Sequence, residues 1–187
     1  MMKLTDKSAE ASNKPLSPRR RFLAKALPVF VYAIFFPAVL FVIPKFFVDP
    51  WLQLPTFLNP AARAVVGGIL IVPGIIFLMW SIKAQRVIGR GTPMPLMATQ
   101  KLVVKKPYSY TRNPLFFGLI NLFFGISIMF GSISSLVMVL LFTVIILLYV
   151  KLIEEKELEK RFGYEYLAYK KTTPFLIPTP SLFRRKN

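Results

Sequence analysis

Two apolar runs decide the fold: they read LFFGLINLFFGISIMF at residues 115–130 and ISSLVMVLLFTVIILLYVKL at residues 133–152. Gly131 and Ser132 separate them, and a pair of this kind is typical of a tight turn. The runs have about the length that an α-helix needs to cross the hydrocarbon core of a bilayer, roughly 20 residues. We therefore expect a helical hairpin that passes through a membrane.

Two further apolar runs precede the hairpin, at about residues 26–48 and 60–85. Asn59 before Pro60 is a good helix cap followed by proline at the first helical position, so a helix should start there. Prolines inside the runs predict that the first helix frays near Pro44, before a loop at residues 49–59, and that the second helix kinks near Pro73. Three glycines in the second run would let another helix approach closely: Gly67, Gly68 and Gly74.

The composition agrees with a membrane protein. The chain has 187 residues, 55% of them hydrophobic, and a mean hydropathy of +0.54. A small water-soluble core cannot bury that much apolar surface. We predict the all-α class: a multi-pass helical membrane protein with about four transmembrane helices, a C-terminal helical hairpin and a cytoplasmic cofactor site.

The chain divides into a membrane domain and two polar tails. We expect a disordered basic tail at residues 1–22, a transmembrane domain at residues 23–171 and a basic tail with several prolines at residues 172–187. The part of the domain that carries recognisable motifs extends over residues 100–178.

The net charge of +17 follows the ends of the apolar runs. Basic residues cluster before the first run, between the second and third, and after the fourth, which by the positive-inside rule places both termini in the cytoplasm. Such charge favours anionic lipid headgroups as partners and argues against nucleic acid, because no basic stripe on a soluble fold is predicted.

The chain contains no cysteine and no histidine. Thiol chemistry is therefore excluded, the usual ligands of zinc are missing, and we expect no metal site. Chemistry must depend on other polar side chains or on a bound cofactor.

Two polar blocks flank the hairpin: KKPYSYTRNPLFFG at residues 105–118 and EEKELEKRFGYEYLAY at residues 154–169. In the first block, Asn113 before Pro114 predicts a helix start with Asn113 as its cap, or an anion site at the free N–H groups. Tyr108 fits either an aromatic belt at the membrane interface or the wall of a ligand site.

The second block holds five of the eight acidic residues. Glu154 and Glu155 lie where the helix leaves the apolar run, and we expect one of them to face into the bundle as a functional group. A spacing of four residues also predicts ordinary surface ion pairs, between Lys151 and Glu155 and between Glu157 and Arg161.

At these residues the chain resembles the superfamily of isoprenylcysteine carboxyl methyltransferases and phospholipid methyltransferases, which are integral membrane enzymes. The matching residues of the first block are Leu102-Val103, Pro107-Tyr108, Arg112-Asn113-Pro114, Phe116 and Gly118. Those of the second block are Glu154-Glu155, Leu158, Phe162-Gly163, Tyr166 and Tyr169. Asn113 stands where the family has His, Phe116 where it has Tyr, and Val150 where the carboxyl methyltransferases have Arg.

The resemblance implies S-adenosylmethionine as the cofactor, bound by Gln100, Lys101, Leu102, Val103, Tyr108, Asn113, Pro114, Leu115, Phe116, Glu154 and Glu155. The reaction it implies is methyl transfer to a lipid-like acceptor in the membrane, in the manner of an isoprenylcysteine carboxyl methyltransferase. A carboxylate acceptor is ionised at neutral pH and needs no general base. We expect Arg112 and Lys151 to be the catalytic cations that meet its anionic end.

Other functions stay open on the sequence alone. They are phospholipid N-methylation, a different reaction of the superfamily such as lipid reduction with a nicotinamide cofactor, and a non-catalytic membrane role.

Overall fold

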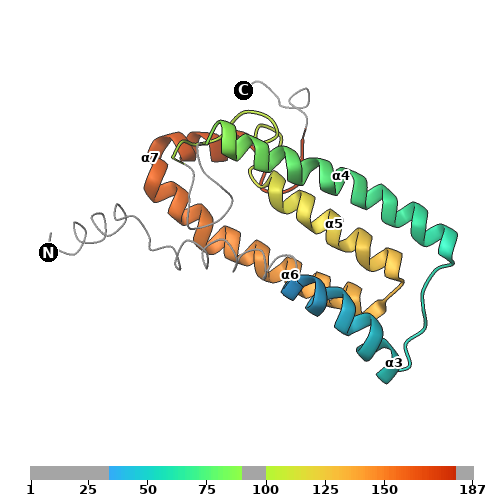
Figure 1. Ribbon diagram of the computed structural model, residues 1–187. Coiled ribbons are helices and arrows are strands. Elements are labelled where there is room, and N and C mark those ends of the chain that lie inside the picture. The colour runs from blue at the N-terminus through green and yellow to red at the C-terminus, as the bar shows by residue number, and fades with distance from the viewer. Residues whose placement is uncertain (1–33, 90–99, 180–187) are drawn as a thin grey trace, which may run out of the picture. The chain divides into compact units, whose positions relative to one another are not determined.

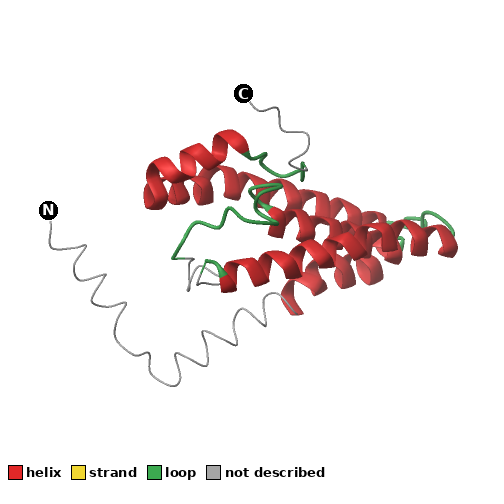
Figure 2. Cartoon of the chain, turned by 90° about the horizontal axis from the view of Figure 1, so that it is seen from above, coloured by secondary structure: helices red, strands yellow, loops and turns green. Residues whose placement is uncertain are grey.

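The computed structural model describes residues 34–89 and 100–179, and every regular element in these two ranges is a helix (Figure 1, Figure 2). The expected tail at residues 1–22, the first part of the run at residues 26–48 and the last eight residues lie outside this description. The chain divides into two units, Met1–Ala38 and Val39–Asn187. In the first unit, residues 34–38 are described and are helical.

The first apolar run stays helical beyond its expected end. The π-helices η2 (Ala38–Val42) and η3 (Pro44–Val48) are followed by the short helix α3 (Asp49–Trp51). Pro44 occupies the start of η3, where the missing N–H of a proline has no helical partner to lose. The expectation that the helix frays at Pro44 is therefore wrong, and the loop begins at Leu52 rather than at residue 49.

The helix α4 (Pro60–Val87) begins where the sequence predicts. The side-chain oxygen of Asn59 accepts a hydrogen bond from the Ala62 N–H at 2.8 Å, which confirms the predicted cap. The helix passes through Pro73 as one element of 28 residues. It is long and apolar enough to cross a membrane.

The helices α5 (Pro114–Phe130) and α6 (Ile133–Tyr149) form the predicted hairpin. Gly131 takes the left-handed conformation, with φ 59° and ψ 35°, which a residue without a Cβ adopts at little cost. The Ser132 hydroxyl accepts a hydrogen bond from the Ser135 N–H at 3.1 Å and so caps α6. The two-residue turn is confirmed.

A seam of glycines joins α4 to α5, which lie side by side (Figure 1). A Cβ on Gly74 would lie 2.9 Å from the Gly118 oxygen, and a Cβ on Gly118 would lie 2.7 Å from the Gly74 oxygen. Gly67 and Gly125 meet in the same way seven residues along each helix. The predicted close approach is thus confirmed for Gly67 and Gly74, whereas Gly68 faces open space.

The chain continues from α6 through the π-helix η5 (Val150–Glu154) into α7 (Glu155–Thr172). This continuous stretch, Ile133–Thr172, is the second one long and apolar enough to cross a membrane, and α5 is a shorter apolar helix. Its apolar part ends at Ile153, and α7 is polar. Gly163 breaks the helical path inside α7, with φ 53° and ψ −127°. The second half of α7 can therefore return to the start of α5, where the polar contacts gather.

Candidate active site

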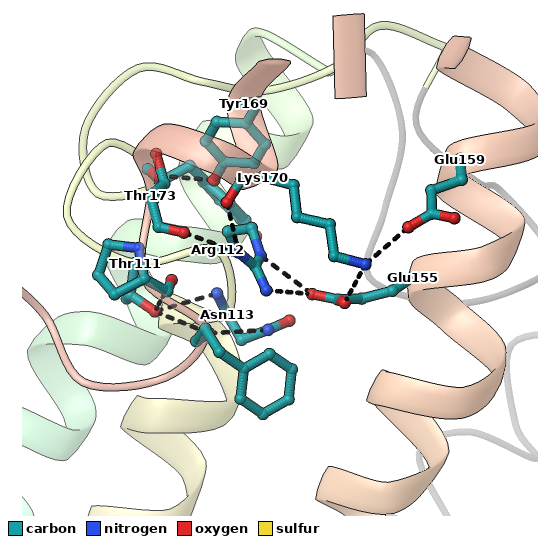
Figure 3. Close-up of polar contacts among 11 residues, drawn as sticks. Thr111, Arg112, Asn113, Glu155, Glu159, Tyr169, Lys170 and Thr173 are labelled. Carbon is teal, nitrogen blue, oxygen red and sulfur yellow. Dashed lines mark hydrogen bonds and ion pairs between the residues drawn. The ribbon is translucent and has the colours of Figure 1, made fainter. Parts of the chain in front are cut away.

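Arg112, two residues before the start of α5, is the centre of the polar cluster (Figure 3). Its Nε and Nη2 lie 2.9 and 2.8 Å from Oε1 of Glu155. Its Nη1 donates to the backbone oxygens of Lys170 at 2.9 Å and Thr173 at 2.8 Å. The guanidinium is thus directed at acceptors of the protein itself, and its side chain is 11% exposed.

Glu155 is the buried carboxylate of this cluster, with a relative exposure of 3%. Its second oxygen, Oε2, lies 3.0 Å from the ammonium of Lys170, which also reaches Glu159 at 2.6 Å. The hydrogen bond to Glu159 raises the pKa of Lys170, and Glu155 adds to this effect. Two cations therefore compensate the charge of Glu155, as a buried carboxylate requires.

The expected pair between Lys151 and Glu155 is not formed, because Glu155 points into the cluster while Lys151 is exposed. The other expected pair is present, with 3.9 Å between Arg161 and Glu157. The prediction that one of the two adjacent glutamates faces inward is confirmed for Glu155.

A C-terminal strap, residues 173–179, runs alongside residues 110–113. Arg112 donates its backbone N–H to the Pro174 oxygen at 2.8 Å, and Thr179 donates its own to the Tyr110 oxygen at 3.0 Å. The Thr111 hydroxyl donates to the Phe175 oxygen at 3.0 Å. These hydrogen bonds attach the strap to the residues that precede α5.

Asn113 does not cap α5, so that part of the prediction is wrong. Its side-chain nitrogen instead donates to the Phe175 oxygen at 2.9 Å, and its backbone N–H donates to the Thr111 hydroxyl at 3.2 Å. The bond to the Phe175 oxygen fixes the orientation of the Asn113 amide, because the reversed amide would place its oxygen against that carbonyl oxygen. The Asn113 side-chain oxygen points away from the strap (Figure 3).

Tyr108 is buried beside α4, against Ala84 and Val103. Its hydroxyl accepts a hydrogen bond from the Gln85 side-chain nitrogen at 2.6 Å, and its backbone oxygen accepts one from the Tyr169 hydroxyl at 2.6 Å. Burial raises the pKa of Tyr108, partly offset by the Gln85 bond, and the negative charge of Glu154 raises it further. Tyr108 and Tyr169, which come from different polar blocks, are therefore joined directly.

Glu154 follows the last apolar residue, Ile153, and so lies just beyond the apolar segment. It is half-buried, and burial raises its pKa from an ordinary value of 4.5 to about 7, with added repulsion from Glu157 and Glu155. A carboxyl group of this kind changes its charge near neutral pH.

The remaining predicted cofactor residues lie on both sides of this cluster. The segment before Tyr108 is anchored to the end of α4, since Gln100 donates its backbone N–H to the Gly89 oxygen at 2.7 Å. Lys101 is exposed, Leu102 half-buried and Val103 buried. The first turn of α5 holds the others: Pro114, which is buried, and Leu115 and Phe116, which are half-buried.

Several residues of the cluster were missed by sequence reasoning: Gln85, Thr111, Glu159, Lys170, Thr173 and Phe175. Three of these supply backbone oxygens, a group that every residue carries, so their identity gives no signal. Pro174 and Pro178 did mark residues 173–179 as non-helical, because proline cannot continue a helix.

A sequence profile of the phospholipid methyltransferase family matches residues 62–165, which is more than half of the chain. The matched range starts in the first turn of α4 and ends inside α7, so it includes Tyr108, Arg112 and Glu155 but not the strap. No curated protein and no solved structure matches the chain.

Proposed function

Because the chain belongs to the phospholipid methyltransferase family, within the superfamily of integral membrane isoprenylcysteine carboxyl and phospholipid methyltransferases, we propose that it transfers a methyl group from S-adenosylmethionine to a lipid-like acceptor. Family membership and the long apolar helices indicate a membrane lipid methyltransferase. One observation supports the rest of the proposal: both polar blocks contribute to a single cluster, through Arg112 with Glu155 and Tyr108 with Tyr169.

The chemistry of these residues suits the cofactor, which when bound supplies an electrophilic methyl group on a cationic sulfur. The Glu154 carboxylate favours a nearby cation, and the Asn113 side-chain oxygen is an acceptor for an N–H or O–H donor. Glu155 binds Arg112 and Lys170, and in our proposal it orients the site rather than contacting the cofactor.

The same site is proposed to face the cytoplasm. Four spans with both termini on that side would bring the start of α5 and the polar helix α7 to the headgroup region of the inner leaflet. The acceptor would then enter from the lipid while the cofactor arrives from water.

An amine headgroup is the acceptor that the geometry supports best. The Arg112 guanidinium, which we expected to meet an anionic acceptor, is engaged with Glu155 and with two backbone oxygens. Glu154 is the carboxylate that, in our proposal, accepts a proton from the headgroup ammonium and so exposes the nitrogen lone pair. Phospholipid N-methylation is therefore the reaction that we favour.

Carboxyl O-methylation is the second candidate. It needs no base, and the exposed Lys151, one turn before Glu155, offers a cation to an anionic headgroup. Lys151→Met would then slow methyl transfer, whereas Lys160→Met, at an exposed position of α7, would not.

The test is to incubate the purified protein in nanodiscs of native lipid with methyl-labelled S-adenosylmethionine. N-methyl products keep their label in alkali, whereas carboxyl methyl esters release it as methanol. Alkali-stable label in the lipid is the expected result, and alkali-labile label would establish the carboxyl reaction instead. No labelled lipid or peptide, together with no cofactor binding, would reject the methyltransferase proposal.

Glu154→Gln tests the cofactor site directly, because it keeps the size of the side chain and removes its charge. We expect about tenfold weaker S-adenosylmethionine binding by calorimetry at pH 8, where wild-type Glu154 is ionised. Binding a cation lowers the pKa of Glu154, so the wild-type protein should release protons on binding near pH 7 and the variant should not. Glu165→Gln, at an exposed position of α7, is the control and should leave both results unchanged.

A further inference from the structure

Gln85, near the end of α4, carries a polar atom that the cluster leaves unpaired. Its side-chain nitrogen donates to the Tyr108 hydroxyl, but its side-chain oxygen is buried and has no hydrogen-bond partner in the structure as described. A buried acceptor without a partner is costly, and such groups in native proteins call for an explanation.

The surroundings of this amide belong to the candidate site. Tyr108, its partner, packs against Ala84 and Val103, and the segment from Gln100 to Val103 is attached to the end of α4 at Gly89. On the other side, the backbone oxygen of Tyr108 accepts a hydrogen bond from the Tyr169 hydroxyl. Gln85 is therefore the residue of α4 that hydrogen-bonds the Tyr108 side chain.

We propose that Gln85 is a further cofactor-binding residue, whose buried side-chain oxygen accepts a hydrogen bond from an N–H or O–H group of S-adenosylmethionine. The adenine amino group and the ribose hydroxyls are donors of this kind. The inference rests on the proposed function and extends it, because neither the sequence motif nor the resemblance includes any residue of α4. In the structure, the Tyr108 hydroxyl pairs with the amide nitrogen and leaves the amide oxygen without a described partner.

The proposal predicts opposite effects on the stability of the free protein and on its affinity for the cofactor. In Tyr108→Phe, the Gln85 amide loses the one partner that the described residues give it, so both of its polar atoms are left unpaired among them. Adding Gln85→Met replaces that amide with an apolar side chain of similar length. The double variant should therefore unfold at a higher temperature than Tyr108→Phe when no cofactor is present.

The same added change should weaken cofactor binding, because the acceptor oxygen is gone. We expect the double variant to bind S-adenosylmethionine about tenfold more weakly than Tyr108→Phe, measured by calorimetry in detergent. Gln85→Glu, which keeps a side-chain oxygen for the ligand and another for Tyr108, should bind within about threefold of wild type. Lys83→Met, an exposed change two residues earlier on α4, should alter neither quantity.

Equal affinities of the double variant and Tyr108→Phe would overturn the inference while leaving the proposed function standing. A purely structural Gln85 would give that result, and so would a water molecule as the partner of its oxygen. If the wild-type protein itself does not bind S-adenosylmethionine, the proposed function and the inference both fail.

Discussion

The two ends of the α5–α6 hairpin satisfy polar groups in different ways. At the turn, separate contacts satisfy the helix ends: beside the Ser132 cap, Ser134 donates its N–H to Asp49 at 3.1 Å, and Arg63 donates to the Phe130 oxygen at 3.4 Å. The acid lies at the start of α6 and the base at the end of α5, the arrangement that the helix dipoles favour.

At the other end, one guanidinium makes four close contacts with the protein and neutralises a buried carboxylate. Asn113, in the cap position of α5, turns its side chain to the strap instead. Buried ion pairs give little net stability, because taking the charges out of water costs about as much as their attraction returns. The turn end is therefore built for stability, and the polar end holds a defined arrangement of functional groups at some cost.

The largest expected difference between the two ends is the side of the membrane on which each lies. A reporter fused after Asn59, which lies near the turn, should report the outer side, and one fused after Asn187 should report the cytoplasm. The signals should be all or none, because polar loops and termini do not exchange between the faces of a bilayer. Equal signals from the two fusions would rule out the four-span topology.

Arg112→Met should give the largest loss of stability. It leaves Glu155 with Lys170 as its remaining cation and removes the donor from two backbone oxygens, which should cost about 3–5 kcal/mol. The measurement is denaturant unfolding in mild detergent, with the exposed change Lys160→Met as the control. If the free energy of unfolding falls by less than about 1 kcal/mol, the Arg112 cluster does not hold the polar end of the hairpin together in the way that we describe.

Ending the chain after Thr172 should have an intermediate effect, because it removes the strap. The truncation removes the backbone oxygens that orient Thr111, Arg112 and Asn113, which should lower the free energy of unfolding by about 2–4 kcal/mol. Because these residues form part of the site, the affinity for the cofactor should fall as well. A chain ending after Thr179 retains the strap and is the matched control. If both truncated proteins bind S-adenosylmethionine equally well, the strap has no role in the site.

Ser132→Ala at the turn should have the smallest effect. Loss of the hydrogen bond to Ser135 removes a helix cap, worth about 1 kcal/mol. Thermal unfolding should detect this change, while cofactor affinity stays at the wild-type value because the turn is at the opposite end of the hairpin from the site. Weaker cofactor binding in this variant would show that the two ends are coupled.

The sequence by itself determined the elements whose signals are local. Apolar runs of membrane length predicted α4, α5 and α6, and Gly131-Ser132 predicted the turn. Asn59 was correctly predicted as a cap because its partner lies three residues away. Gly67 and Gly74 indicated a close helix contact, although the sequence could not say which helix would supply it.

The tertiary structure decided the partners of the polar residues. Glu155 is four residues from Lys151, yet it binds Arg112, which is 43 residues away. The break at Gly163 lets the second half of α7 return, so that Lys170 and Thr173 reach the same guanidinium. Asn113 was expected to bond within its own helix and instead meets a backbone oxygen 62 residues later. Hydrogen bonds to neighbouring turns of a helix follow from chain geometry, but a bond to a distant carbonyl depends on packing, and any residue type can supply that carbonyl.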